Sequence, residues 1–218
     1  ICCNGKDIFS MDSEYRKLLG YLPQDFGFYP EFTVEDYLLY IAALKGIRPI
    51  VAKKRVKELI AKVGLSKAAH KKMKKLSGGM KRRAGIAQAM LNNPKILILD
   101  EPTAGLDPVG KDQILNLLKK LHEEKKITII LVSHSMEDVA DYAQRVIVMN
   151  GGQVMYEGDK KEVFSHKKEL EEAGLAVPFY RQVCEELADR GFPIQRDLLT
   201  LEETKEAILE GLKGLRGK

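Results

Sequence analysis

Two acidic residues, Asp100 and Glu101, directly follow the continuous apolar run of residues 96–99. Such a run is typical of a parallel β-strand that is buried on both faces. Side chains that follow the strand emerge at the carboxyl edge of an open α/β sheet, where ligands bind. Asp100 could hold Mg²⁺ there, because hard cations prefer carboxylate oxygen, and Glu101 could activate a water molecule for attack on a phosphoryl group. Taken alone, the pair equally fits a strand that ends in a polar turn.

A second group of residues suits an anion. Residues 76–80 read Leu-Ser-Gly-Gly-Met and open a helical pattern. Ser77 is expected to cap this helix, while Gly78 and Gly79 leave backbone N–H groups uncovered for a phosphate. Three basic residues at 81–83 raise the local positive potential. An isolated Ser-Gly-Gly is also an ordinary helix start.

Three further polar positions gain meaning only from their neighbours. Asp107 lies in the Pro-, Gly- and Asp-containing stretch 102–108, which by itself is typical of a turn. His134 follows the apolar run 127–132, so we expect it at the same sheet edge as Asp100. A single histidine there is more often structural than catalytic. Gln24 follows Pro23 after an early strand and alone predicts no chemistry.

The elements that must position these residues are an α/β set. A short strand is followed by a turn at residues 4–5 and then by a strand over 18–22. Residues 33–92 are mostly helical, with Thr33 and Asp36 as a capping box and Gly64 as the end of the second helix. The runs 96–99 and 127–132, joined by an apolar helix face, predict a parallel strand–helix–strand unit.

The rest of the chain predicts a hairpin and a helical tail. The hairpin joins residues 145–149 to 153–156 through Asn150 and Gly151. Residues 160–218 show helical spacing, and Thr200 with Glu203 forms a second capping box.

Composition narrows the class of protein. The 218 residues carry a net charge of +5, yet residues 45–83 hold 15 Lys or Arg against one acid. That block could meet nucleic acid, lipid headgroups or phosphates, although a solvated helix face is the simpler interpretation. Three cysteines without a CxxC pair argue against a disulfide scaffold or a zinc site and favour a reducing compartment. No apolar run is long enough to span a bilayer.

Together the motifs resemble those of the nucleotide-binding domain of ABC transporters. Gln24 is similar to the Q-loop glutamine, residues 76–80 to the LSGG signature and residues 96–101 to the Walker B strand. Residues 104–107 resemble the D-loop, and His134 the switch histidine. The resemblance covers residues 1 to about 160, with the motifs in the family's order and spacing, which makes it specific.

The resemblance implies a fold, cofactors and residue roles. The fold is a P-loop NTPase (ABC ATPase) of the α/β class with a mostly parallel sheet and a helical subdomain. The cofactors are ATP, which lies between two such domains, and Mg²⁺. Asp100 and Gln24 would hold Mg²⁺, Glu101 would activate water and His134 would contact the γ-phosphate. Ser77, Gly78 and Gly79 would bind the opposing domain's ATP, and Asp107 would bridge the two sites.

The sequence departs from the family in one motif. No G-x-x-x-x-G-K-[ST] phosphate loop occurs in these 218 residues. Because the family has this loop upstream of the segment that matches residues 1–24, and because the chain begins at Ile1, we expect an N-terminally truncated chain. The strand and helix beside the Walker B strand would then be missing, and part of the core would be exposed.

Two subfamilies contribute to the resemblance. Residues 14–108 look like exporter-type ATPases, whereas the sequence from about Gly110 looks like ATPases of energy-coupling factor importers of vitamins or metal ions. A fusion near residues 105–112 and a single divergent family both explain this change. We favour the importer interpretation, because the C-terminal tail is the part of the sequence that is least common among ABC ATPases in general.

The expected organisation and function follow. Residues 1–160 would form the ATPase domain, with the helical subdomain at about 30–92, and residues 161–218 a C-terminal helical extension. We expect an ATP-hydrolysing subunit, peripheral on the cytoplasmic face of the membrane, that pairs with a second ABC ATPase subunit and with transmembrane subunits, without direct nucleic-acid contact. The alternatives are an exporter ATPase, a soluble ABC ATPase acting on nucleic acid or the ribosome, and an inactive fragment or fusion that at most lends its signature motif.

Overall fold

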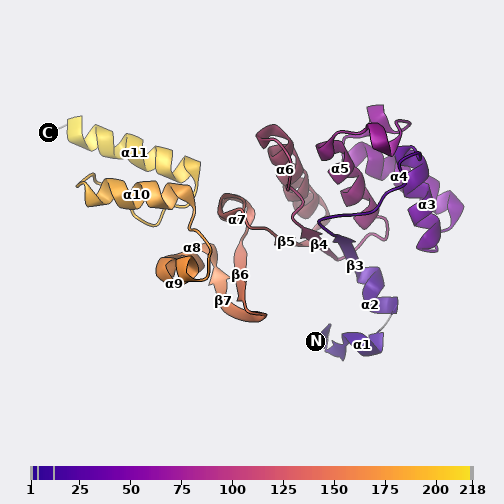
Figure 1. Cartoon of the computed structure of the whole chain (residues 1–218), viewed down its shortest axis with the longest axis horizontal. Coiled ribbons are helices and arrows are strands. Elements are labelled where there is room, and N and C mark those ends of the chain that lie inside the picture. Colours follow the sequence, from indigo (N-terminus) through magenta and orange to yellow (C-terminus); the bar gives the residue numbers. More distant parts are fainter. Residues whose placement is uncertain (1, 4, 12, 217–218) are drawn as a thin grey trace. The chain divides into compact units, whose positions relative to one another are not determined.

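The computed structural model describes residues 2–3, 5–11 and 13–216. The chain forms two compact units, Ile1–Val132 and Ser133–Lys218, whose elements are labelled in Figure 1. Each unit is described by itself. The sequence predicts an ATPase domain that ends at residue 160 and a C-terminal extension that begins at residue 161. This boundary stays a prediction.

The first unit is built on a three-stranded parallel sheet in the order β3-β4-β5. The strands are β3 (Leu19–Leu22), β4 (Ile96–Asp100) and β5 (Thr128–Val132). Leu22 pairs with Leu99, and Asp100 pairs with Val132. The parallel register brings the carboxyl ends of all three strands to one edge of the sheet, which confirms the predicted strand–helix–strand unit.

The prediction that both apolar runs are buried on two faces is right for neither strand. In β4, Leu97 and Leu99 point to one face and are fully buried, whereas Ile96 and Ile98 point to the other face and are half-buried. Ile130 and Val132 of β5 are 46% and 49% exposed. In the part of the chain that the structure describes, β5 pairs with β4 alone, so it behaves as an edge strand. The exposed apolar surface therefore lies on β5, and the expectation of a strand missing directly beside β4 is corrected.

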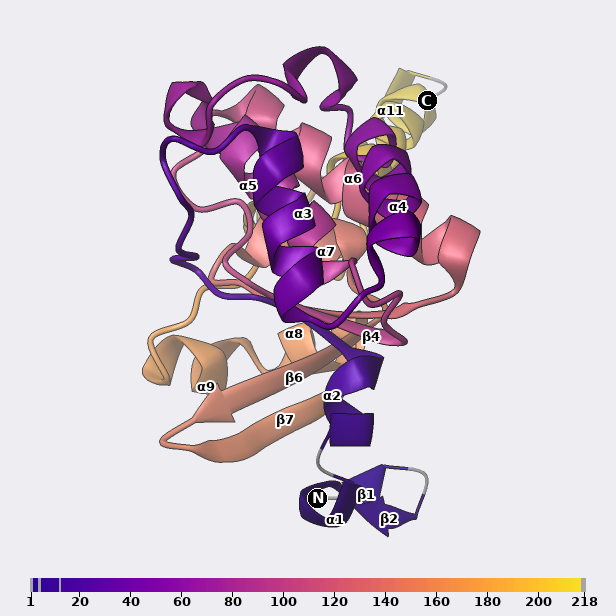
Figure 2. The same cartoon turned by 90° about the vertical axis from the view of Figure 1, so that its right-hand side faces the viewer.

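The segment between β3 and β4 contains three long helices and contributes most of the buried residues in the hydrophobic core of this unit. They are α3 (Val34–Leu44), α4 (Pro49–Lys62) and α5 (Gly78–Ala89), and the short 3₁₀ turns η1 (Ser66–Ala68) and η2 (Met73–Lys75) lie between α4 and α5. The predicted cap of α3 is confirmed: the Asp36 amide donates to Thr33 Oγ1 over 3.1 Å. Gly64 ends α4 with a positive φ of 69°. Figure 2 shows α3, α4 and α5 above the sheet.

Helix α6 (Pro108–Lys125) connects β4 to β5 and buries Ile114, Leu118 and Leu121. The N-terminal segment contains the hairpin β1 (Cys2–Cys3) and β2 (Lys6–Asp7), followed by α1 (Ile8–Met11) and α2 (Ser13–Leu18). These two helices were not expected. The predicted turn at residues 4–5 includes Asn4, which lies outside the described residues.

The second unit contains a hairpin and five helices within its described part. The predicted hairpin is confirmed: it joins β6 (Arg145–Asn150) to β7 (Gln153–Asp159). Its turn lies at Gly151 and Gly152, one residue later than predicted, because Asn150 belongs to β6 and pairs with Gln153. The helices are α7 (Met136–Tyr142), α8 (Lys160–Ser165), α9 (Lys167–Glu172), α10 (Phe179–Asp189) and α11 (Leu201–Arg216). The second capping box is also confirmed, because Glu203 accepts from the Thr200 amide and donates its own amide to Thr200 Oγ1.

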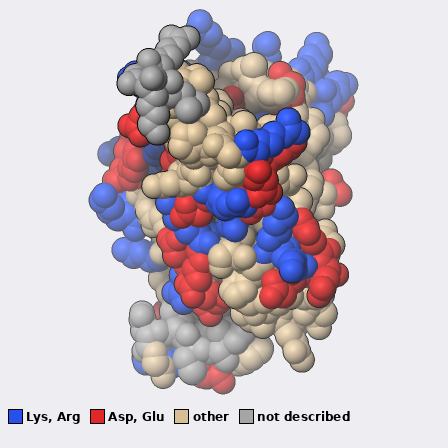
Figure 3. All heavy atoms as spheres, turned by 90° about the vertical axis from the view of Figure 1, so that its left-hand side faces the viewer, with Lys and Arg blue, Asp and Glu red and all other residues tan. Residues whose placement is uncertain are grey.

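Charged side chains of both signs cover the face on which α10 and α11 lie (Figure 3). Ion pairs explain part of this mixture. Glu185 accepts from Lys167 Nζ at 2.6 Å and from Arg181 Nε at 3.0 Å, which connects α9 to α10. Arg190 pairs with Glu186 one turn earlier.

Candidate functional site

One groove of the first unit contains both the Ser-Gly-Gly segment and the Asp107 segment. It encloses about 500 Å³. Its lining residues come from the end of α4, the start of α5 and the start of α6, and they include Ser77, Gly78, Gly79, Leu106, Asp107 and Arg83. The structure thus brings together two motifs that are about thirty residues apart in the sequence. Each contributes a helix N-terminus, where backbone N–H groups attract anions.

Ser77 and Asp107 occupy equivalent positions at the starts of two helices. Ser77 Oγ accepts from the Met80 amide over 3.3 Å and caps α5. Asp107 Oδ1 accepts from the Gly110 amide over 3.2 Å and caps α6. Both residues are exposed. Both residues therefore act as helix caps, and any contact that they make with a ligand is a second role.

Leu106 lies close to the first residues of α5, and closest to Gly78. A Cβ atom built on Gly78 would lie 3.3 Å from Leu106 Cδ2, and one on Gly79 would lie 4.0 Å from the same atom. The Leu106 side chain therefore packs over the first turn of α5, where a side chain at residue 78 would require it to shift and one at residue 79 would make an ordinary contact. Sequence reasoning missed Leu106, because its only signal is the pair of small residues that makes room for it.

The basic residues after the Ser-Gly-Gly segment have specific partners. The Arg82 guanidinium donates to the Gln24 carbonyl oxygen, and the Arg83 guanidinium donates to Gln113 Oε1 of α6. Lys81 Nζ lies 5.1 Å from the centre of the Phe28 ring. We expected residues 81–83 to act as a source of positive potential. The structure shows that they also connect α5 to the loop after β3 and to α6.

Asp100 and Gln24 emerge next to each other at the carboxyl edge of the sheet. Leu22 pairs with Leu99, Asp100 ends β4, and Gln24 follows β3 by two residues. Asp100 is half-buried and Gln24 is exposed. A carboxylate and an amide oxygen suit Mg²⁺, which commonly keeps water molecules and takes its remaining ligands from substrate phosphates. No cluster of three or more acidic, His or Cys side chains that could bind a metal by itself occurs among the described residues.

Glu101 adopts an unusual backbone conformation. Its φ is +45°, in the left-handed region that residues with a Cβ rarely adopt, and its amide donates to the Val132 carbonyl over 3.0 Å. Such a conformation costs free energy and persists only where the surrounding structure enforces it, which is common at functional sites. The half-buried Glu101 side chain is thus held at the edge where the strands end.

His134 belongs to the second unit. It follows Val132 and Ser133 in the chain, and its side chain is exposed. The structure therefore describes Asp100, Glu101 and Gln24 in one unit and His134 in the other. The contact of His134 with a phosphate stays a prediction.

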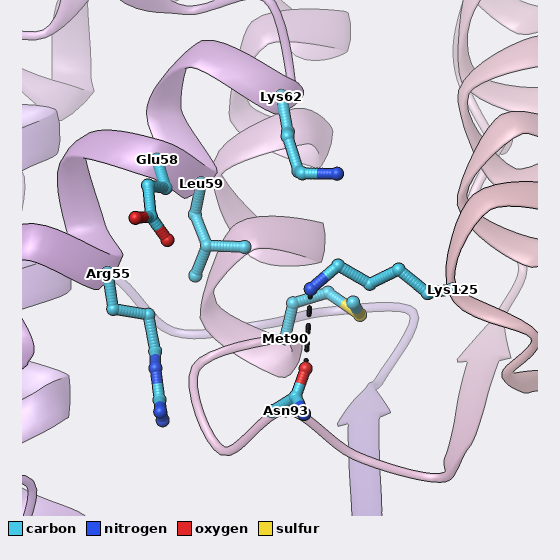
Figure 4. Close-up of a pocket in the computed structure, with 7 residues that line it drawn as sticks. All are labelled: Arg55, Glu58, Leu59, Lys62, Met90, Asn93 and Lys125. Carbon is cyan, nitrogen blue, oxygen red and sulfur yellow. Dashed lines mark hydrogen bonds between the residues drawn. The ribbon is translucent and has the colours of Figure 1, made fainter.

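A smaller pocket of about 180 Å³ lies between α4 and the ends of α5 and α6 (Figure 4). Its basic side chains already have partners within the unit. Arg55 donates to the Leu91 carbonyl at 2.6 Å, and Lys125 donates to Asn93 Oδ1 at 3.3 Å. Lys62 pairs with Glu124 at 2.9 Å. These contacts join α4 to the end of α5 and α6 to the loop before β4, so packing within the unit explains the pocket.

Comparison with known proteins decides the family. Residues 1–104 match the ABC transporter family. The chain is 44% identical over 225 aligned positions to the energy-coupling factor transporter ATP-binding protein EcfA2 of Caldanaerobacter subterraneus, covering 99% of this chain and 77% of that protein. The chain belongs to the ATP-binding proteins of ABC transporters. Its fold is that of the P-loop NTPases in their ABC ATPase form.

Further comparisons agree with this assignment. The EcfA2 protein of Clostridium perfringens is 45% identical over 91% of this chain and 70% of its own length. The solved structure of cbiO1 from the same organism, described as part of the ABC transporter complex cbiONQ, matches with a TM-score of 0.70 at 31% identity, over 87% of this chain and 73% of that one. The EcfA2 match extends on both sides of residues 105–108, so both parts of the chain are similar to ABC ATPases.

Proposed function

We propose that this ABC ATPase binds and hydrolyses ATP to power an energy-coupling factor importer of vitamins or metal ions. It would work with a second ABC ATPase subunit and with transmembrane subunits, on the cytoplasmic face of the membrane. Among the described residues, no helix has both the length and the apolar character needed to cross a membrane. The observation that carries the proposal is the groove shared by Ser77 and Asp107, with Asp100 and Glu101 at the sheet edge of the same unit.

Each residue has a defined task in this proposal. Ser77 and the amides of Gly78 and Gly79 bind the terminal phosphate of an ATP molecule that a second ATPase subunit presents to the groove. Positioning and hydrogen-bond donation at such a site lower the barrier for phosphoryl transfer. Asp107 keeps α6 capped while it faces the same groove.

The acids at the sheet edge act on a second ATP. Asp100 and Gln24 hold Mg²⁺, which when bound neutralises charge on the β- and γ-phosphates. Glu101 accepts a proton from the attacking water and so makes that water a better nucleophile. His134 donates to the γ-phosphate. The left-handed backbone at Glu101 would set the direction of this carboxylate.

The test uses the chain in its natural complex. The protein is tagged, isolated with its partners from detergent-solubilised membranes, and assayed for ATP hydrolysis. Glu101→Gln should leave the complex assembled and lower its turnover by about 100-fold or more, the typical contribution of a general base. Glu123→Gln, which makes the same change at an exposed position of α6, is the matched control and should leave turnover unchanged.

Three outcomes would contradict the proposal. The isolated complex could lack any transmembrane subunit, or it could fail to hydrolyse ATP. Alternatively, Glu101→Gln could hydrolyse ATP at the unaltered rate while a change at Ser77 abolishes hydrolysis. The chain would then lend only its signature groove to a partner's active site.

A further inference from the structure

A second surface of the first unit combines positive charge with exposed aliphatic side chains. It is the α3–α4 corner, which we define as residues 44–57. Residues 45–57 include six Lys or Arg and no acid. At the same corner Leu44 is 67% exposed and Ile50 is 87% exposed, the latter being the most exposed large apolar side chain in the described part of the chain.

The geometry of α4 separates this surface from the core. Ala52, Val56 and Leu59 face inward and are buried. Ile50, Lys54 and Lys57 follow one another at helical spacing on the opposite face, and all three are exposed. Helices α3 and α4 lie side by side in Figure 2, so Leu44 at the end of α3 precedes the start of this face by only a short turn.

Some cations of the first unit are neutralised by carboxylates of the same unit. Lys72 and Lys74 both pair with Glu31, and Lys62 pairs with Glu124. Within the part of the chain that the structure describes, Arg48, Lys53, Lys54 and Lys57 form no ion pair. Their charge is therefore not neutralised within the protein and is available to an external anionic surface.

We propose that the α3–α4 corner docks on anionic lipid headgroups, with Ile50 and Leu44 inserted at the boundary between headgroups and acyl chains. Clustered lysines are attracted to an anionic leaflet, and exposed aliphatic side chains add apolar burial at its surface. Nucleic acid would also be attracted to the lysines. Proteins that bind single strands stack aromatic side chains on the bases, however, and this mode of binding does not explain an exposed isoleucine. This contact does not depend on ATP hydrolysis, so it stands or falls separately from the proposed function.

The test is cosedimentation of the whole chain with vesicles of phosphatidylcholine alone or of phosphatidylcholine mixed with phosphatidylglycerol. Binding should require phosphatidylglycerol and weaken with salt. Lys53→Gln with Lys54→Gln should weaken it about 30-fold, since each lysine near an anionic surface contributes roughly five-fold. Ile50→Gln should weaken binding and leave its salt dependence unchanged.

The matched control removes the same charge elsewhere. Lys168→Gln with Lys205→Gln changes two exposed lysines of the second unit and should leave vesicle binding within about two-fold, because neither lysine belongs to the α3–α4 corner. Circular dichroism establishes that every variant is folded. Equal losses in the two double variants would overturn the proposal, because net charge alone would then explain binding. It would also be overturned by equal binding to both vesicle types, by no vesicle binding, or by an oligonucleotide that binds where vesicles do not.

Discussion

Ser77 allows the structural and the ligand-binding roles of one side chain to be separated. Its hydroxyl accepts from the Met80 amide over 3.3 Å, at an exposed helix start. Ser77→Ala removes this cap and should cost about 0.5–1 kcal/mol of unfolding free energy, the lower part of the usual range because the bond is long. Ser77→Asp keeps an acceptor and adds a negative charge at the N-terminus of α5, which should contribute roughly 0.3–1 kcal/mol. The expected order of stability is therefore Asp, then Ser, then Ala.

The expected order of ATP hydrolysis is different. If Ser77 faces a terminal phosphate, the phosphate will repel the carboxylate of the Ser77→Asp variant. For unit charges about 4 Å apart at an effective dielectric constant of about 20, the repulsion amounts to about 4 kcal/mol. That energy corresponds to roughly a 1,000-fold weaker interaction. The alanine variant loses one neutral hydrogen bond and should fall only about ten-fold. The more stable aspartate variant should thus be the less active one.

Chemical denaturation measures the first order, and ATP hydrolysis by the isolated transporter complex measures the second. Thr33→Ala is the control, because Thr33 caps α3 with the same geometry but lies outside the groove. It should lower stability and leave hydrolysis unchanged. Wild-type hydrolysis by Ser77→Asp would refute the placement of a phosphate at this residue, and an alanine variant as stable as the wild type would refute the cap.

Two further predictions concern the scaffold of each unit. Gly20→Ala should destabilise the first unit by about 3 kcal/mol, because the new Cβ would lie 2.5 Å from the Ala89 carbonyl oxygen and overpacking of this kind is costly. A melting curve identical to that of the wild type would show that Gly20 and Ala89 are not in this close contact. Burial by itself would raise the pKa of Glu185, but the hydrogen bonds from Lys167 and Arg181 outweigh it and lower that pKa. The link therefore stabilises the fold at neutral pH and is lost as the pH falls through the lowered value, so Glu185→Gln should cost about 2 kcal/mol at neutral pH and almost nothing in acid. Melts at both pH values check this, and an equal cost at both would contradict it.

Local chemistry made the helix starts predictable. Thr33, Ser77 and Thr200 were each expected to cap a helix, and each accepts a hydrogen bond from the amide three residues later. A cap depends on a side chain and the backbone a few atoms away, so the sequence contains nearly all of the information. The burial of β5 was not predictable in this way. The sequence shows that residues 129–132 are apolar, but it does not show which strands pair with them.

The groove shows the same limit within a functional motif. The types of Ser77 and Asp107 indicated their chemistry, and the resemblance to the family indicated that they act together. Neither indicated that Leu106 packs against Gly78, because such contact depends on how α5 and α6 approach each other. Tertiary contacts of this kind decide distances, and distances decide whether two motifs can serve one ligand.

Helix α5 connects more than the two sides of the groove. Its N-terminal residue pair packs against Leu106, Arg83 is bonded to α6, and Arg82 is bonded to the Gln24 carbonyl in the loop after β3. The two arginines therefore act locally as hydrogen-bond donors: Arg82 joins α5 to the loop after β3, and Arg83 joins it to α6. Helix α5 thus contacts both the loop at the sheet edge and the segment that contains Asp107, which places it between the two parts of the candidate site.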